Sequence, residues 1–177
     1  METQTNISAA INRSFVNFDS FDIASVDTGP GGPGKVVGIW FNAINNGNVS
    51  TNKFRALVSC ISVPAVKTEP FELFKWNESD AIPNALGPRQ KSTIGSRECQ
   101  LITHDMIHDI QFGKSFMYLL GEIQYRDRID PKPLHKTRIS QQLYVSAVST
   151  DEKGVIHFLH STESRGRNNC TDEDCPD

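Results

Sequence analysis

Three carboxylates and one histidine, Glu122, Asp127, Asp130 and His135, are the side chains whose types and spacing could do chemistry most directly. They lie on both sides of one predicted turn, and such a set offers oxygen ligands for calcium or mixed ligands for zinc. An unbroken strand would point Glu122 and Asp127 to opposite faces. The alternative is that Tyr125, Asp127 and His135 order the turn through hydrogen bonds. We expect that structural role and no bound metal, and we keep Asp127, Asp130 and His135 as candidate ligands.

A second pair, His104 and His108, has the spacing that puts two imidazoles on one face of a helix, as in helical zinc sites. Cys99 is a conceivable third ligand. The zinc-protease pattern has Glu after its first histidine, whereas Asp105 stands there in this chain. The alternative is a pair of exposed polar residues on a short helix. We expect the latter, with His104 and His108 kept as candidate ligands.

The sequence contains no familiar catalytic signature. It has no Gly-x-Ser-x-Gly elbow, and its glycine-rich stretch at 29–34 lacks the Lys-Ser/Thr ending of a phosphate-binding loop. His157 and His160 have opposite strand parity, which disfavours a joint site. The sequence therefore predicts no catalytic residue and no cofactor, and we expect that the protein is not an enzyme.

Size and charge limit the class of protein. The chain has 177 residues, of which 37% are hydrophobic, as in one globular domain with a single core. Its net charge is −3 and its basic residues are scattered, which argues against nucleic acid as a partner. No apolar run approaches the roughly 20 residues that cross a bilayer. These features predict a soluble domain.

The four cysteines are Cys60, Cys99, Cys170 and Cys175. A chain of this size does not need disulfides to fold, so a reduced compartment is the simpler interpretation. Cys60 lies in an apolar run and is expected to be a free buried thiol. For Cys170 and Cys175, both a disulfide that closes a small loop and a pair of exposed thiols remain open.

Apolar residues alternate along most of the chain with the period of β-strands. A bulge near Asp19-Ser20 repairs the register of the first strand, and Asn46-Gly47 marks a tight turn after the second. One or two helical turns are expected at 104–110. The pattern predicts an all-β, antiparallel two-sheet sandwich of about seven strands. Its core depends on six inward-facing side chains: Val37, Ile39, Phe41, Met117, Leu119 and Ile123.

Residues 62–92 combine several prolines with one compact aromatic cluster, Phe71, Phe74 and Trp76. We interpret this stretch as a long irregular connection, and such loops are often functional. The three aromatic residues are the expected anchors for a protein partner, because binding energy concentrates in such side chains. The alternative is a small hydrophobic cluster under the loop. A partner peptide could instead add to an exposed strand edge.

Five short motifs follow one another along the chain: Ser14-Phe15-Val16, Asn45-Asn46-Gly47-Asn48, Leu86-Gly87-Pro88, Gly121-Glu122-Ile123-Gln124-Tyr125-Arg126-Asp127 and His135-Lys136-Thr137. In this order they resemble a widespread group of uncharacterised bacterial proteins. In that group one or two N-terminal transmembrane helices precede an immunoglobulin-like β-sandwich. This chain departs from the group at Val49-Ser50-Thr51 and in lacking the membrane helices, which suggests a shortened protein, a fragment or a soluble relative.

The resemblance implies a short helix at 1–13, an immunoglobulin-like β-sandwich at 14–160 and a disordered acidic tail at 161–177. We expect a non-catalytic interaction module that is tethered to a membrane, binds another protein and is a possible homo-oligomer. The alternative is a metal-dependent or hydrolytic enzyme built on the 121–135 hairpin or on His104 and His108. The expected place is the cytoplasmic side of the inner membrane, or the cytoplasm for an unanchored chain, with an extracytoplasmic place left open.

Overall fold

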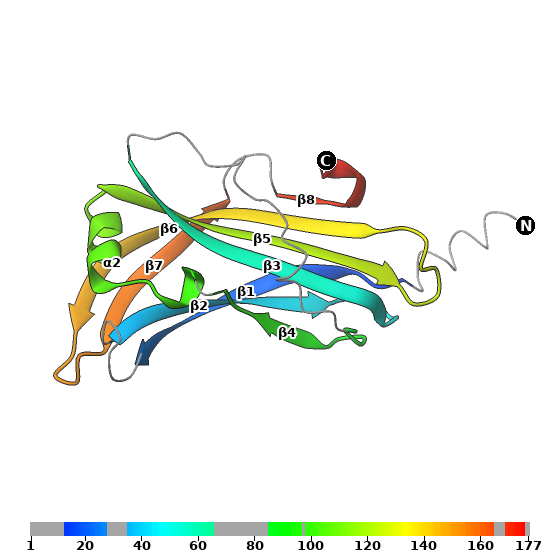
Figure 1. Cartoon of the computed structure of the whole chain (residues 1–177), viewed down its shortest axis with the longest axis horizontal. Helices are drawn as coiled ribbons and strands as arrows, with labels where there is room; N and C mark the ends of the chain where they lie inside the picture. The colour runs from blue at the N-terminus through cyan, green and yellow to red at the C-terminus, as the bar shows by residue number, and fades with distance from the viewer. Residues whose placement is uncertain (1–12, 28–34, 66–84, 97, 165–168, 176–177) are drawn as a thin grey trace, which may run out of the picture.

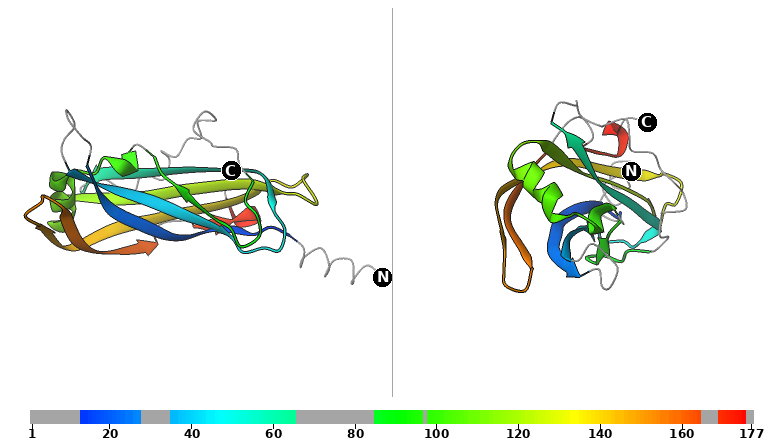
Figure 2. Two further views of the ribbon diagram at one scale, coloured as in Figure 1. Left: turned by 90° about the horizontal axis from the view of Figure 1, so that it is seen from below. Right: turned by 60° about the vertical axis from the view of Figure 1, so that its left-hand side comes forward.

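A computed structural model of the chain describes residues 13–27, 35–65, 85–96, 98–164 and 169–175. Its strands form two antiparallel sheets that pack face to face, as Figure 1 and Figure 2 show. The first sheet has the order β1 (Val16–Asp27), β2 (Lys35–Asn45) and β4 (Lys91–Ile94). The second has the order β3 (Thr51–Pro64), β5 (Ser115–Asp127), β6 (His135–Thr150) and β7 (Ile156–Ser164). The predicted all-β, two-sheet architecture is confirmed.

The core lies between the two sheets because the strands bury alternate side chains there. All six residues predicted to face inward are at most 1% exposed, which confirms the period-two interpretation. Gly121 allows close packing of the sheets, since a Cβ atom at this position would lie 2.5 Å from Cζ of Phe18. The register of β1 shifts between Phe18 and Ser20, where the bulge was predicted.

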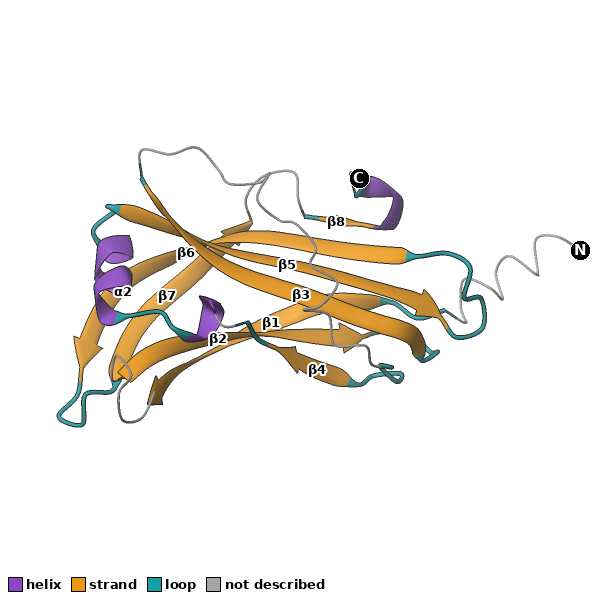
Figure 3. Ribbon diagram, viewed as in Figure 1, coloured by secondary structure: helices purple, strands orange, loops and turns teal. Residues whose placement is uncertain are grey.

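The helix α2 (His104–Gln111) covers the end of the core that is far from β8 in Figure 3. Thr103 caps its first turn by accepting a hydrogen bond from the backbone N–H of Met106, and Ile107 and Ile110 are buried in the core. The strand before α2 is short. β4 ends at Ile94, and the 3-10 helix η2 (Glu98–Gln100) follows.

The expectation of a free thiol at Cys60 is corrected by a disulfide to Cys99. Cys60 is in β3 of the second sheet, and Cys99 is in η2 beside the first. The two Cα atoms are 5.0 Å apart, and both side chains belong to the hydrophobic core. This bond ties the two layers together.

The C-terminal part of the chain also differs from the expected acidic tail. β7 continues to Ser164, β8 (Cys170–Thr171) pairs with β6, and the 3-10 helix η3 (Asp172–Asp174) follows. A disulfide joins Cys170 to Cys175 and closes a small loop, which is the first of the two states left open for this pair. Among the described helices, none has the length and apolar character needed to span a bilayer.

Candidate functional site

The turn between β5 and β6 brings together Asp127 and His135, two of the predicted site residues. Asp127 is the last residue of β5 and His135 the first of β6, so strand pairing places them at the same end of the sandwich. Nε2 of His135 lies 3.2 Å from Oδ2 of Asp127, and the imidazole stacks on the ring of Tyr125 with centroids 5.0 Å apart. All three side chains are buried.

The second oxygen of Asp127 binds the segment that enters β1. Oδ1 accepts hydrogen bonds from the backbone N–H of Ser14, at 2.7 Å, and from the hydroxyl of Ser14. Ser14 is fully buried, and its hydroxyl bonds to the carboxylate rather than to an imidazole. A nucleophilic serine needs a neighbouring general base with access to substrate. Ser14 therefore serves to fix the start of β1.

Asp172 completes the group, although it is 37 residues from His135 in the sequence. Its Oδ2 lies 3.1 Å from Nδ1 of His135 and 3.1 Å from Nη2 of Arg13, and its Oδ1 accepts a hydrogen bond from the backbone N–H of Lys136. We call Arg13, Ser14, Asp127, His135 and Asp172 the polar cluster. Asp172 was not among the predicted site residues, and the one sequence signal near it is its position between Cys170 and Cys175.

The electrostatics of the polar cluster centre on His135. Each of its ring nitrogens faces a carboxylate. A neutral imidazole donates to one of them only, whereas an imidazolium ion donates to both. Burial raises the pKa of the neighbouring Tyr125 to about 12. Within the described residues, the hydroxyl of Tyr125 makes no hydrogen bond of ordinary geometry. The nearby backbone of Val16 still lowers the pKa of Tyr125 and offsets part of the effect of burial.

The other carboxylates of the predicted group lie elsewhere. Glu122 is on the opposite face of β5, where Nε of Arg138 is 2.6 Å from its Oε2 and Gln124 donates to its Oε1. The predicted opposite orientation of Glu122 and Asp127 is thus confirmed. Asp130 is exposed and accepts a hydrogen bond from the backbone of Lys132. In the described ranges, no three His, Cys, Asp or Glu side chains are arranged to hold a metal ion.

The two helical histidines lie on one face of α2, as their spacing predicted. The rings of His104 and His108 stack with centroids 6.4 Å apart, and the ring centroids of His108 and Phe112 are 4.5 Å apart. Cys99, the conceivable third ligand, is bonded to Cys60 and so has no free thiolate for a metal. The aromatic residues expected as anchors, Phe71, Phe74 and Trp76, lie outside the described residues.

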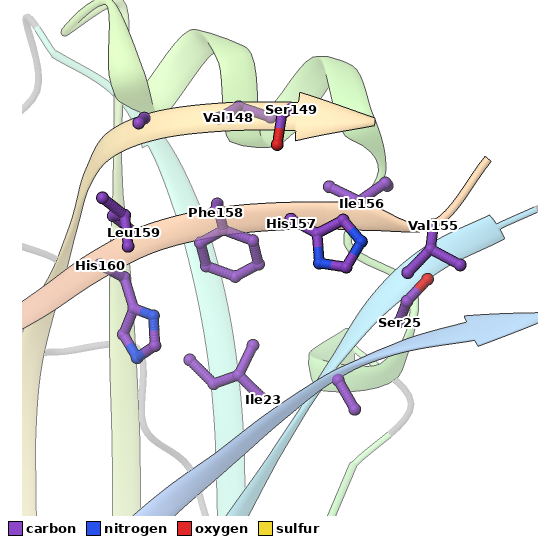
Figure 4. Close-up of a pocket in the computed structure, with 12 residues that line it drawn as sticks. Ile23, Ser25, Val148, Ser149, Val155, Ile156, His157, Phe158, Leu159 and His160 are labelled. Carbon is purple, nitrogen blue, oxygen red and sulfur yellow. The ribbon is translucent and has the colours of Figure 1, made fainter. Parts of the chain in front are cut away.

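A groove of about 630 Å³ opens at the other end of the sandwich, between β1 and the β6–β7 hairpin (Figure 4). We call it the β1–β7 groove. Ile23 and Ser25 of β1 line one wall, and Phe158 and His160 of β7 line the other. Leu159, also in its lining, is 68% exposed.

The strand count explains why this groove exists. Four strands of the second sheet form a continuous path, whereas the first sheet has three, one of them only four residues long. Among the described strands, β1 pairs only with β2, and β7 pairs only with β6. Both strands therefore present an unpaired backbone edge beside the groove. The sequence could not show this feature, since it depends on which strands share a sheet.

Comparisons with protein-family models, with curated proteins and with solved structures find no match to this chain.

Proposed function

We propose that the protein is a non-catalytic interaction module and that an extended segment of another protein binds in the β1–β7 groove. The observation that carries this proposal is the combination of an apolar groove with two strand edges that are unpaired within the described part of the chain. A peptide that added to the edge of β1 would supply a fourth strand to the first sheet and would cover Phe158. Its backbone would provide affinity, and its inward side chains would provide specificity.

The contacts within the polar cluster support a structural role for Asp127 and His135, which the sequence suggested as candidate ligands. Asp127 and His135 bind each other, and Ser14 and Asp172 occupy their remaining hydrogen-bonding atoms. A catalytic acid or base must reach a substrate, whereas the side chain of His135 is 11% exposed. We therefore prefer a binding module to the metal-dependent or hydrolytic alternative.

The strand order supports an immunoglobulin-like fold as part of the proposal. In constant-type immunoglobulin domains, strands A, B and E share one sheet and strands C, F and G share the other. β1, β2 and β4 correspond in order to A, B and E, and β3, β5 and β6 correspond to C, F and G. β7 is then an additional strand after G. Membership of the membrane-anchored bacterial group, with its N-terminal tether, belongs to the same proposal.

The two disulfides support an extracytoplasmic place for the module rather than the cytoplasmic one first expected. All four cysteines are paired, and disulfides persist mainly in oxidising compartments. Alkylation of intact cells followed by denaturation and mass spectrometry tests this. Four unalkylated, paired cysteines in the native protein support the oxidising compartment, and free thiols at Cys60 and Cys99 contradict it.

The binding proposal is tested with peptides selected from a random library on the purified, oxidised chain. Leu159→Lys places a charge in the groove lining, and Ile129→Lys is a matched control. Leu159 and Ile129 are 68% and 69% exposed, and Ile129 is in the distant β5–β6 turn. We expect Leu159→Lys to weaken peptide binding at least about tenfold and Ile129→Lys to leave it unchanged. Equal effects of both substitutions, or selected peptides that leave the β1 amide resonances unshifted, would refute the groove as the site.

A further inference from the structure

We propose that the Cys170–Cys175 disulfide is an exchangeable redox site for a dithiol reductant, and that its reduction releases Asp172 from His135 and Arg13. We call residues 170–175 the C-terminal clasp. The clasp holds the chain at the point where it enters β1, at the end of the sandwich opposite the β1–β7 groove. The clasp and the proposed peptide site are therefore separate parts of the molecule.

The clasp joins three distant parts of the chain through Asp172. This carboxylate contacts Arg13, just before β1, and His135 and the Lys136 amide at the start of β6. The charged and titratable groups that surround the contact are Arg13, Asp127, His135, Tyr125 and Asp172 itself. Without Asp172, the Arg13 guanidinium loses an ion pair and Nδ1 of His135 loses its carboxylate.

Besides the contacts of Asp172, strand pairing and Asn169 hold the clasp in place. β8 contributes only two register positions, Thr171 opposite Thr137 and Cys170 opposite Arg138. Asn169 adds two hydrogen bonds to the backbone of Ser140, at 3.0 and 3.1 Å. Asp172 also has φ of 51°, a left-handed conformation that is uncommon for residues other than glycine, although Asp adopts it more readily than most. Covalent closure of the loop therefore contributes to holding Asp172 in this position.

The two disulfides differ in access to solvent. Cys99 is fully buried and Cys60 is 8% exposed, both within the core. Cys170 and Cys175 are partly exposed at the surface. Thiol–disulfide exchange requires a thiolate to approach one of the sulfur atoms, so a reductant reaches the clasp first.

Reduction of the clasp proceeds through two thiol–disulfide exchange steps. One thiolate of a dithiol reductant attacks a clasp sulfur, breaks the S–S bond and forms a mixed disulfide. The second thiolate of the reductant then displaces the remaining cysteine. The reductant leaves as a disulfide, and Cys170 and Cys175 each gain one electron and one proton.

Selective reduction is the first test. The folded full-length chain is treated with dithiothreitol, alkylated and analysed by mass spectrometry. We expect alkylation at Cys170 and Cys175 well before Cys60 and Cys99. Simultaneous alkylation of all four cysteines, or of Cys60 and Cys99 first, overturns the proposal.

Amide hydrogen exchange is the second test, and it separates release of the clasp from unfolding. The amides of Lys136 and Ser14 donate to Asp172 and Asp127, respectively. On reduction, and equally in Cys170→Ala/Cys175→Ala, we expect at least about tenfold faster exchange at Lys136 and a smaller rise at Ser14. The core amide of Leu119 should not change. Unchanged exchange at Lys136 overturns the proposal.

A matched pair of aspartate substitutions tests the role of Asp172. Asp172→Asn keeps the disulfide but removes the charge, and should accelerate exchange at Lys136. Asp130→Asn changes an exposed aspartate of the neighbouring turn, whose side chain accepts from Lys132 instead, and should have no effect at Lys136. Equal effects of the two substitutions would show that Asp172 does not hold the junction.

Discussion

His135 and Asp172 are 37 residues apart in the sequence, yet Nδ1 of the imidazole lies 3.1 Å from a carboxylate oxygen of Asp172. The same imidazole contacts Asp127 through its other nitrogen. His135 therefore connects the β5–β6 hairpin to the C-terminal loop, and its two carboxylate partners contact Ser14 and Arg13 just before β1. Substitutions in the polar cluster should therefore change the free energy of unfolding.

Asp127→Ala should destabilise the fold by about 3 kcal/mol, because it leaves the Ser14 amide and His135 without their buried partner. Asp127 is 7% exposed, whereas Asp130 in the same hairpin is exposed. Asp130→Ala should change stability by less than about 0.5 kcal/mol. Urea unfolding measures both, and equal losses would contradict a special role for Asp127.

Asn45→Ala should cost about 3 kcal/mol, since it removes four hydrogen bonds of a fully buried amide. Its Oδ1 accepts from the backbone of Phe15 and Gly47, and its Nδ2 donates to the carbonyls of Val49 and Leu86. These bonds join the residue before β1, the turn after β2 and the segment before β4. Asn46→Ala, at an exposed neighbouring position, is the control and should be nearly neutral in thermal and urea unfolding.

Removal of the two disulfides should have unequal effects on the free energy of unfolding. The Cys60–Cys99 bond closes a loop with a sequence separation of 39, and the Cys170–Cys175 bond a loop with a separation of 5. Loop-closure entropy predicts losses of about 4 and about 2 kcal/mol for the two double alanine variants. Unfolding in urea under oxidising conditions measures them. A larger loss for the Cys170/Cys175 variant would contradict this order.

Stability should fall in alkaline solution because of Tyr125. Its pKa in the folded protein is about 12, above the ordinary value of 10.0, so the unfolded state loses the phenolic proton first. The neutral phenol favours the folded state fully below pH 10, and this contribution is lost as the pH rises towards 12. Tyr125→Phe should reduce the alkaline slope of stability, and thermal unfolding from pH 8 to 12 measures it. The control Tyr144→Phe changes a hydroxyl that donates to Glu163, and should leave the slope unchanged.

Sequence periodicity was sufficient for most of the fold. Val37, Ile39 and Phe41 alternate because they line one face of a strand, and local turn residues such as Asn46-Gly47 mark where strands end. The helix at α2 was also predictable, since Ile107 and Ile110 have helical spacing and both are buried. These signals are local, so one sequence contains them.

The candidate site was only partly predictable, for a physical reason. Asp127 and His135 flank one turn, and their proximity follows from hairpin pairing. Asp172 reaches them through tertiary packing, and the pairing of Cys60 with Cys99 likewise joins segments of different sheets. The β1–β7 groove depends on the strand order within each sheet, which period-two patterns do not specify.

The edges of β1 and β7, which pair with no further strand among the described residues, must also avoid pairing with copies of the protein. The C-terminal half of β7 is polar: residues 160–164 are His, Ser, Thr, Glu and Ser, and all are exposed. Polar and charged edges of this kind discourage edge-to-edge aggregation. Leu159, just before this polar segment, is apolar and exposed. The residue proposed to contact a partner is therefore also the one through which the protein would first self-associate at high concentration.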